Sequence, residues 1–209
     1  MFIHQIPRIV PTILPKLIWS NPVGEKNNAV YFTFDDGPTP EITNFVLDCL
    51  AQFEAKATFF CIGKNVVSNP EIAFQIQASG HRIGNHTMNH ANAWKYNRED
   101  YQKNYTACEE VFDQMNIKSV GFRPPYGRVN SFIYQNMTLT TPIYMWSFLS
   151  GDYNQDLSAS SIIQAGIKHI KPGSILVFHD SVKAFPRLKI VLPALLDYCR
   201  QQNFKPELL

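Results

Sequence analysis

The sequence predicts an α/β barrel formed by a single domain within a chain of 209 residues. Apolar and β-branched runs alternate with segments of helical periodicity, and short connections join them, which is typical of parallel strands covered by helices. Polar residues capable of chemistry follow almost every expected strand, as in a barrel whose strand ends meet at one mouth. The glycine-rich phosphate loop of a doubly wound sheet is absent. A barrel of eight units or fewer is therefore favoured.

The first half of the chain contains the clearest strand and helix signals. Ala29–Asp35 has the continuous sequence AVYFTFD of a buried strand, and apolar side chains in residues 41–53 recur along one helical face. Asn69 is a residue type that caps helices, and Pro70 suits the first helical turn. We expect strands at 29–35, 56–62 and 81–84, and helices at 41–53 and 70–79.

The second half of the chain repeats the alternation without internal repeats, low-complexity tracts or long linkers. Its strand candidates are short apolar runs, and its helix candidates show helical periodicity. We expect strands at 120–124, 143–147 and 174–179, and helices at 98–114, 130–137, 158–170 and 186–201.

The charge of the chain is nearly balanced, with a formal net charge of +2. Basic residues are scattered, and no run of five like charges occurs. Nucleic acid and other polyanions are therefore not favoured as partners. No CxxC pair occurs among the cysteines, so we expect buried, reduced thiols at all four positions, Cys49, Cys61, Cys108 and Cys199.

Residues 1–26 are expected to form an arm that lies extended on the domain, which spans residues 27–209. The arm is rich in apolar residues, but a membrane-spanning helix needs about 20 of them in a row, so no transmembrane segment is expected. No small-residue cleavage site follows a clean apolar stretch. The compartment stays open between the cytoplasm and export by an unrecognised route. Three prolines argue against a helix in the arm, Pro7, Pro11 and Pro15.

Two adjacent acidic residues, Asp35 and Asp36, end the first expected strand. On a regular strand they would point to opposite faces, and one would enter the core at a high desolvation cost. Gly37 and Pro38 require a turn at this point, so both acids can reach the mouth of a site. Like charges this close resist joint ionisation unless a cation lies nearby. A solvent-exposed loop is the alternative for an isolated Asp-Asp-Gly sequence.

His86 and His90 are separated by four positions, so their imidazoles can converge on one metal ion if the segment is a helical turn. Together with one carboxylate they would form an Asp-His-His set that leaves a coordination position open for water. We expect one divalent metal ion, with zinc first and cobalt, nickel, manganese or iron as other candidates. An isolated HxxxH pair can also arise by coincidence.

Two further motifs follow later strands. In the sequence RPPYG, two prolines fix the backbone, so Arg123 can pair with a carboxylate and the amide of Tyr126 can receive an oxyanion. A structural turn with a surface arginine is the alternative. The apolar run LVF ends at His179, which is suited to acid catalysis near neutral pH.

Taken together, the stretches TFDDGP, HTMNH, RPPYG, WSFLSGDY and LVFH resemble the five motifs of the polysaccharide deacetylase family, in their usual order. This family is also called carbohydrate esterase family 4 or the NodB-homology domain. The motifs span Thr33 to His179, and the surrounding pattern of strands and helices extends the match from about Asn27 to the C-terminus. The resemblance implies a deformed (β/α) barrel of seven or eight units with a shallow groove for a sugar chain.

The resemblance also implies a role for each motif residue. It implies Asp35 as general base with Arg123 as its partner, and the amide of Tyr126 as part of the oxyanion hole. His179 would protonate the leaving amine. The remaining implied roles are the metal ligands Asp36, His86 and His90, the orienting residue Asp152, and the residues that line the pocket for the acetyl methyl, Trp146 and Leu176.

The fourth motif departs from the family pattern, with Leu149 where an aspartate is frequent and Tyr153 where a tryptophan is usual. We expect a hydrolase that removes N-acetyl groups from a glycan containing N-acetylglucosamine, such as chitin fragments or peptidoglycan. An acetyl ester hydrolase acting on acetylated xylan and a non-catalytic carbohydrate-binding barrel are the alternatives. The sequence does not set the oligomeric state.

Overall fold

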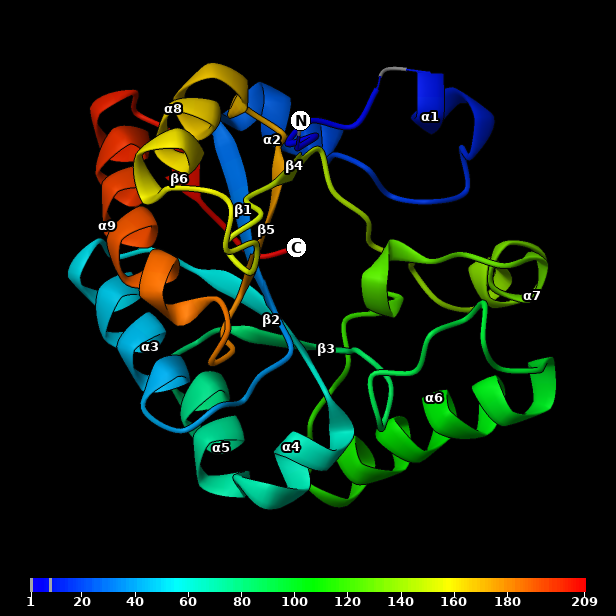
Figure 1. Ribbon diagram of the computed structural model, residues 1–209. Coiled ribbons are helices and arrows are strands. Elements are labelled where there is room, and N and C mark those ends of the chain that lie inside the picture. The colour runs from blue at the N-terminus through cyan, green and yellow to red at the C-terminus, as the bar shows by residue number, and fades with distance from the viewer. Residues whose placement is uncertain (1, 8) are drawn as a thin grey trace.

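Parallel strands surrounded by helices form the centre of the molecule (Figure 1). The structure is a computed structural model that describes residues 2–7 and 9–209. The strand order is β3-β2-β1-β5-β4, and β6 pairs with the first residues of β1. The strands are β1 (Ala29–Asp35), β2 (Ala57–Cys61), β3 (Arg82–Asn85), β4 (Phe148–Leu149), β5 (Ile175–His179) and β6 (Lys205–Pro206).

Isolated bridges complete the ring of strands. Asn85 at the end of β3 pairs with Phe122, which pairs with Ile143, and the same segment continues into β4 beside β5. The strands expected at 120–124 and 143–147 are therefore present only as single bridges. Pro124 and Pro125, which follow Phe122 closely, and Pro142, which precedes Ile143, have no N–H for a longer ladder. The α/β barrel is confirmed, and its deformation lies in this part of the ring.

Helices cover the outside of the strands, and each helix expected from the sequence is present, with the one expected at 130–137 shorter than predicted (Figure 1). The side chain of Asn69 donates to Pro38 and Asn65 carbonyls instead of capping the helix that begins at Pro70. The short helix α4 was not expected. The helices of the domain are α3 (Ile42–Gln52), α4 (Gly63–Ser68), α5 (Pro70–Ala78), α6 (Arg98–Gln114), α7 (Ser131–Gln135), α8 (Ala159–His169) and α9 (Phe185–Gln201).

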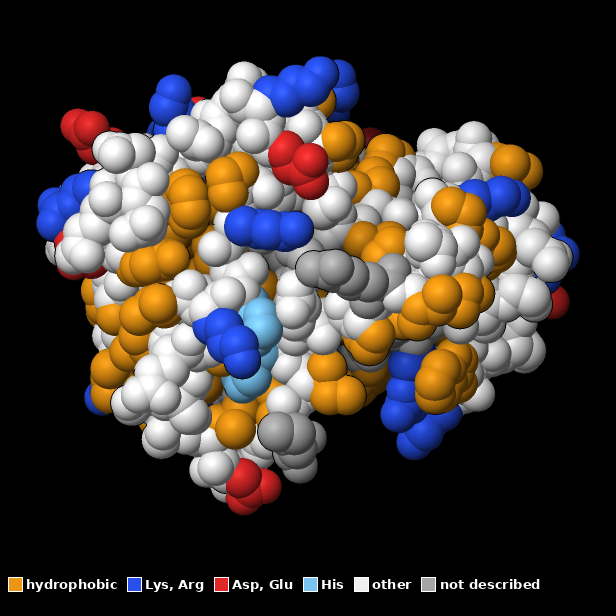
Figure 2. Space-filling view, turned by 90° about the horizontal axis from the view of Figure 1, so that it is seen from above, with side chains coloured by type: hydrophobic (Ala, Val, Ile, Leu, Met, Phe, Trp, Pro, Cys, Tyr) orange, Lys and Arg blue, Asp and Glu red, His pale blue; other side chains and the backbone are white. Residues whose placement is uncertain are grey.

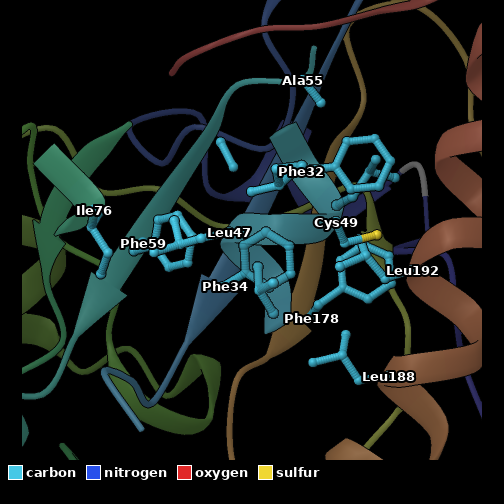
Figure 3. Close-up of a cluster of buried hydrophobic side chains, with 14 of the residues drawn as sticks. Phe32, Phe34, Leu47, Cys49, Ala55, Phe59, Ile76, Phe178, Leu188 and Leu192 are labelled. Carbon is cyan, nitrogen blue, oxygen red and sulfur yellow. The ribbon is translucent and has the colours of Figure 1, made fainter. Parts of the chain in front are cut away.

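The main core lies between the strands and the outer helices, where phenylalanine rings pack against one another (Figure 3). The ring centroids of Phe32 and Phe178 lie 5.7 Å apart, and those of Phe34 and Phe59 lie 5.1 Å apart. Because side chains alternate along a strand, these outward residues leave Thr33 and Asp35 pointing into the barrel. All four cysteines are buried free thiols, as expected.

The N-terminal arm contains two short helices, α1 (Ile9–Ile13) and α2 (Pro22–Asn27), so the expectation of a fully extended arm is wrong. Pro11 is tolerated because N–H groups in the first helical turn have no intrahelical partner. The segment at Ile18 adds to the ring: its N–H donates to Ile143, and its carbonyl accepts from Met145. No helix in the described ranges is long and apolar enough to cross a membrane. Figure 2 shows the molecule from above the view of Figure 1, and on this face hydrophobic side chains are exposed among charged ones.

Candidate functional site

The chain turns sharply at the carboxyl end of β1, and this turn presents two carboxylates to one cavity. Asp35 is the last residue of β1 and is buried, whereas Asp36 adopts a positive φ of 83° and is half-buried. Gly37 fits tightly, because a Cβ there would collide with the carboxylate of Asp180. Asp180 accepts hydrogen bonds from the amide of Gly37, at 3.0 Å, and from the hydroxyl of Thr43, at 2.5 Å. Asp180 thus holds the turn, a role that the sequence did not reveal.

Asp36, His86 and His90 converge as the sequence predicted. Their nearest ligand atoms all lie within 4.8 Å of one another, and Oδ1 of Asp36 is 3.8 Å from Nε2 of His86 and 3.3 Å from Nε2 of His90. The expected helical turn is absent, because Thr87 and His90 have positive φ values in the loop after β3. The imidazoles meet through loop geometry instead of through helical spacing.

The protonation pattern of these histidines suits metal ligation. Nδ1 of His86 lies 2.7 Å from the carbonyl oxygen of Arg123, so an Nδ1–H donor leaves the Nε2 lone pair facing Asp36. Burial lowers the pKa of His86, and burial together with His86 lowers that of His90 to about 4. Oδ1 of Asp36 is buried with no hydrogen-bond partner among the described residues. An orphaned carboxylate oxygen facing two neutral imidazoles fits a divalent cation.

The loop that carries both histidines is fixed by hydrogen bonds that sequence reasoning missed. The side chain of Asn85 accepts from the amide of Thr87, at 2.6 Å, and donates to Glu109 of α6, at 2.7 Å. The hydroxyl of Thr87 accepts from the amide of Ala91, at 2.8 Å. Asn85 and Thr87 thereby hold the left-handed turns that the backbone needs here.

Arg123 is fully buried and pairs with Asp35, with 2.8 Å between Nη1 and Oδ1. The guanidinium also donates to the hydroxyl of Thr33, at 2.6 Å, and to the carbonyl of Met145, at 3.0 Å. Burial raises the pKa of Asp35, but the opposing effect of Arg123 and nearby histidines is larger, and the net pKa is lowered. Asp35 is therefore ionised at neutral pH and fixed in the cavity wall.

His179, which is half-buried, pairs with the fully buried Asp152. Nδ1 of His179 lies 2.8 Å from Oδ1 of Asp152, whose Oδ2 accepts from the amide of His179 at 2.9 Å. Burial lowers the pKa of His179, but the Asp152 carboxylate outweighs it and raises the pKa to about 9. The ring of Tyr153 packs edge-on against the imidazole. His179 is therefore protonated at neutral pH and can act as an acid.

Tyr126 lies in a short 3-10 turn, Pro125–Gly127, with a φ of 60°. Its amide has no acceptor within the described part of the chain, so it is available to a ligand. Its hydroxyl lies 3.1 Å from Nδ1 of His90, a contact that the sequence did not predict. Gly127 has a φ of 62°, and a Cβ there would collide with the ring of Trp146.

These groups surround one cavity of about 610 Å³. The cavity contains the predicted residue Trp146, but Leu176 does not line it and packs in the outer core instead. Val177 takes its place, since alternate residues of β5 face the barrel and His179 is among them. The lining consists of Asp35, Asp36, His86, His90, Tyr126, Gly127, Trp146, Leu149, Tyr153, Val177, His179, Ser181, Val182 and Lys183.

Comparison with known proteins gives consistent matches. A family model described as polysaccharide deacetylase matches residues 23–141. A peptidoglycan-N-acetylglucosamine deacetylase of Bacillus cereus is 33% identical over 190 residues, which cover 90% of this chain and 88% of that protein. A chitooligosaccharide deacetylase of Sinorhizobium fredii is 32% identical over 73% of this chain and 72% of its own length. Some relatives are longer, and the match spans 34% of the deacetylase PgdA of Listeria monocytogenes.

A solved structure extends the likeness to the whole fold. The crystal structure of a peptidoglycan N-acetylglucosamine deacetylase in complex with 4-naphthalen-1-yl-N-oxidanyl-benzamide superposes with a TM-score of 0.84 at 28% identity. The superposition covers 96% of this chain and 93% of the other. The sequence motifs, the barrel and these matches agree, and the chain belongs to the polysaccharide deacetylase family.

Proposed function

We propose that this chain is a metal-dependent hydrolase that removes N-acetyl groups from a glycan containing N-acetylglucosamine. One observation carries the proposal: an Asp-His-His cluster, an ionised carboxylate and a protonated histidine line the same cavity. The names of the relatives above support this substrate class. The cavity volume of about 610 Å³ suits a sugar-sized ligand.

Asp36, His86 and His90 would hold the cation, which we propose to be zinc. Two nitrogen ligands and one oxygen ligand suit zinc and leave a coordination position open, although such sets discriminate weakly against cobalt, nickel, manganese and iron. When bound, the cation supplies a Lewis acid that polarises an acetyl carbonyl and lowers the pKa of water to about 7. Oδ1 of Asp36 is buried and has no hydrogen-bond partner within residues 2–7 and 9–209, which supports placing the cation beside it.

The other residues would carry the proton transfers and fix the substrate. Asp35, kept ionised by Arg123, would accept a proton from the attacking water. The amide of Tyr126 would donate a hydrogen bond to the oxyanion of the tetrahedral intermediate. His179, oriented by Asp152, would give its proton to the departing nitrogen. This step matters for an amide, whose amine is a poor leaving group.

The acetyl methyl would occupy an apolar part of the cavity beside Trp146. Leu149 and Val177 also line the cavity and offer apolar surface. Leu149 replaces an aspartate that is frequent in the fourth motif of the family. An apolar side chain there enlarges the surface available to a methyl group.

The test is acetate release from N-acetylglucosamine oligomers and from acetylated xylan, before and after removal of metal. We expect release from the N-acetylated oligomers, loss of that release in thoroughly chelated protein, and recovery on addition of zinc. Undiminished release from protein that elemental analysis shows to be metal-free would refute the metal role. Release from xylan alone would identify an ester hydrolase, and metal binding without release from either glycan would indicate a binding barrel.

A further inference from the structure

Two exposed aromatic rings and a half-buried arginine form a row that begins where the cavity ends. The ring of Tyr126 lines the cavity, and the guanidinium of Arg128 lies 5.4 Å from its centroid. The same guanidinium lies 4.8 Å from the ring of Trp94. Trp94 and Tyr126 are 66% and 61% exposed, which is high for large aromatic residues. We call these three residues the aromatic row.

The aromatic row is held in place by hydrogen bonds between two loops. Nε1 of Trp94 donates to the carbonyl of Val129, at 3.1 Å, and its backbone amide donates to the side chain of Asn92, at 3.0 Å. The side chain of Asn130 donates to the carbonyl of Ala93, at 2.9 Å. These bonds tie the indole to the loop that carries Tyr126 and Arg128. The exposed rings are therefore a preorganised surface, and exposed apolar surface of this kind is characteristic of binding sites.

The charge of the row is not balanced by an acid. Among the residues that the structure describes, no carboxylate forms an ion pair with Arg128 or with Lys183, which lines the cavity from the loop after β5. A guanidinium that stacks on aromatic faces keeps its N–H edge available, and that edge matches a carboxylate with two parallel hydrogen bonds. The apolar C–H face of a pyranose ring packs well on an exposed aromatic ring.

We propose that Trp94, Tyr126 and Arg128 form a sugar-binding subsite next to the acetyl site, and that this subsite selects a neighbouring sugar that bears a carboxylate. The sugar ring would stack on the aromatic rings, and its carboxylate would accept hydrogen bonds from Arg128. A lactyl ether on a hexosamine carries such a carboxylate. The inference rests on the proposed function and adds the chemistry of the neighbouring sugar. The net charge of +2 does not favour polyanions in general, whereas this subsite recognises a single carboxylate.

The experiment compares three tetrasaccharides. The first contains only β-1,4-linked N-acetylglucosamine, the second alternates it with N-acetylmuramic acid, and the third is the methyl ester of the second. The ester keeps the shape of the lactyl group but removes its charge. For the wild-type protein we expect kcat/KM for the acid to exceed that for the ester about tenfold, in line with one charge-assisted hydrogen-bond pair. Raising the salt concentration should reduce this ratio.

Three variants assign the preference to the aromatic row. Arg128→Gln should remove the preference for acid over ester, and Arg128→Lys should restore part of it. Trp94→Ala should raise KM for all three glycans by roughly five- to tenfold, because the stacking surface is lost. Phe74→Ala is the control, since Phe74 is 67% exposed on α5 and does not line the cavity. Circular dichroism checks that each variant is folded.

Equal kcat/KM for acid and ester in the wild type, or a preference that survives in Arg128→Gln, would overturn the subsite. Failure of the proposed function gives a different result, namely no acetate release from any of the three glycans. In that case calorimetric binding of the acid and the ester to the wild type and to Arg128→Gln decides the question. Tighter binding of the acid that disappears in Arg128→Gln supports the subsite, and equal binding overturns it.

Discussion

Replacing Asp152 with Asn separates the acid role of His179 from a purely structural one. The carboxylate of Asp152 accepts both from Nδ1 and from the backbone amide of His179. An asparagine keeps the shape but loses the charge and can accept only through its single oxygen. The imidazolium then loses its main stabilising partner, and only the weaker attraction of Asp36 and Asp35 opposes the effect of burial on the pKa. The His179 pKa should therefore fall from about 9 towards the unperturbed value of about 6.5.

The size of the effect depends on pH. At pH 8, a pKa of about 9 leaves roughly 90% of His179 protonated, whereas a pKa of about 6.5 leaves roughly 3%. At pH 6 both forms are mostly protonated. If the imidazole of His179 also loses its fixed orientation, activity falls by the same factor at both pH values. The activity defect of Asp152→Asn should therefore be roughly twentyfold larger at pH 8 than at pH 6.

The assay is kcat/KM for acetate release between pH 6 and pH 9, with the metal content of each protein measured. Asp156→Asn is the matched control, because Asp156 is exposed and only four residues away. The alkaline limb of the profile should move to lower pH in Asp152→Asn and stay in place in Asp156→Asn. A defect of the same size at every pH would refute the acid role that we assign to His179.

Three further outcomes are expected. His179→Ala should slow hydrolysis of an N-acetyl glycan more than hydrolysis of an activated acetyl ester, and equal losses would remove His179 from the acid role. Gly127→Ala should lower the thermal midpoint and raise KM, because the positive φ is strained and the new Cβ displaces Trp146; an unchanged midpoint would contradict this packing. Because its folded-state pKa lies above the unfolded value of about 6.5, His179 should stabilise the fold fully below pH 6.5 and lose that effect as pH rises through 9, which urea unfolding across this range measures.

The sequence predicted the elements whose stability comes from local pattern. Ala29–Asp35 and Arg98–Gln114 have the bounds expected, because continuous apolar sequence and helical periodicity are strong signals. The sequence-based expectations were wrong for segments whose structure depends on contacts with distant parts of the chain. The prolines of the arm argued against a helix, yet α1 forms. The segments at 120–124 and 143–147 pair through single bridges that only the closed ring provides.

In the site, too, the sequence located the motif residues but not the contacts that position them. Motif order located Asp35, Asp36, His86 and His90, but the left-handed loop that joins the histidines depends on Asn85 and Thr87. Leu176 was assigned to the wrong face of β5. Alternation along the strand contained the correction, since His179 at the mouth places residues 177 and 175 on the same inward face. No pattern in the sequence predicts the contact between the Tyr126 hydroxyl and His90.

The central claim is that Asp36 holds a cation while its neighbour Asp35 moves a proton. Substitution of each by Asn, with bound metal and kcat measured on both proteins, tests this claim most directly. Arg123 retains Thr33 and two backbone carbonyls as acceptors, so Asp35→Asn should remain folded. Asp36→Asn should lose metal and turnover together, whereas Asp35→Asn should keep its metal while kcat falls by roughly 10²–10⁴. Metal lost from Asp35→Asn but retained by Asp36→Asn would contradict the account.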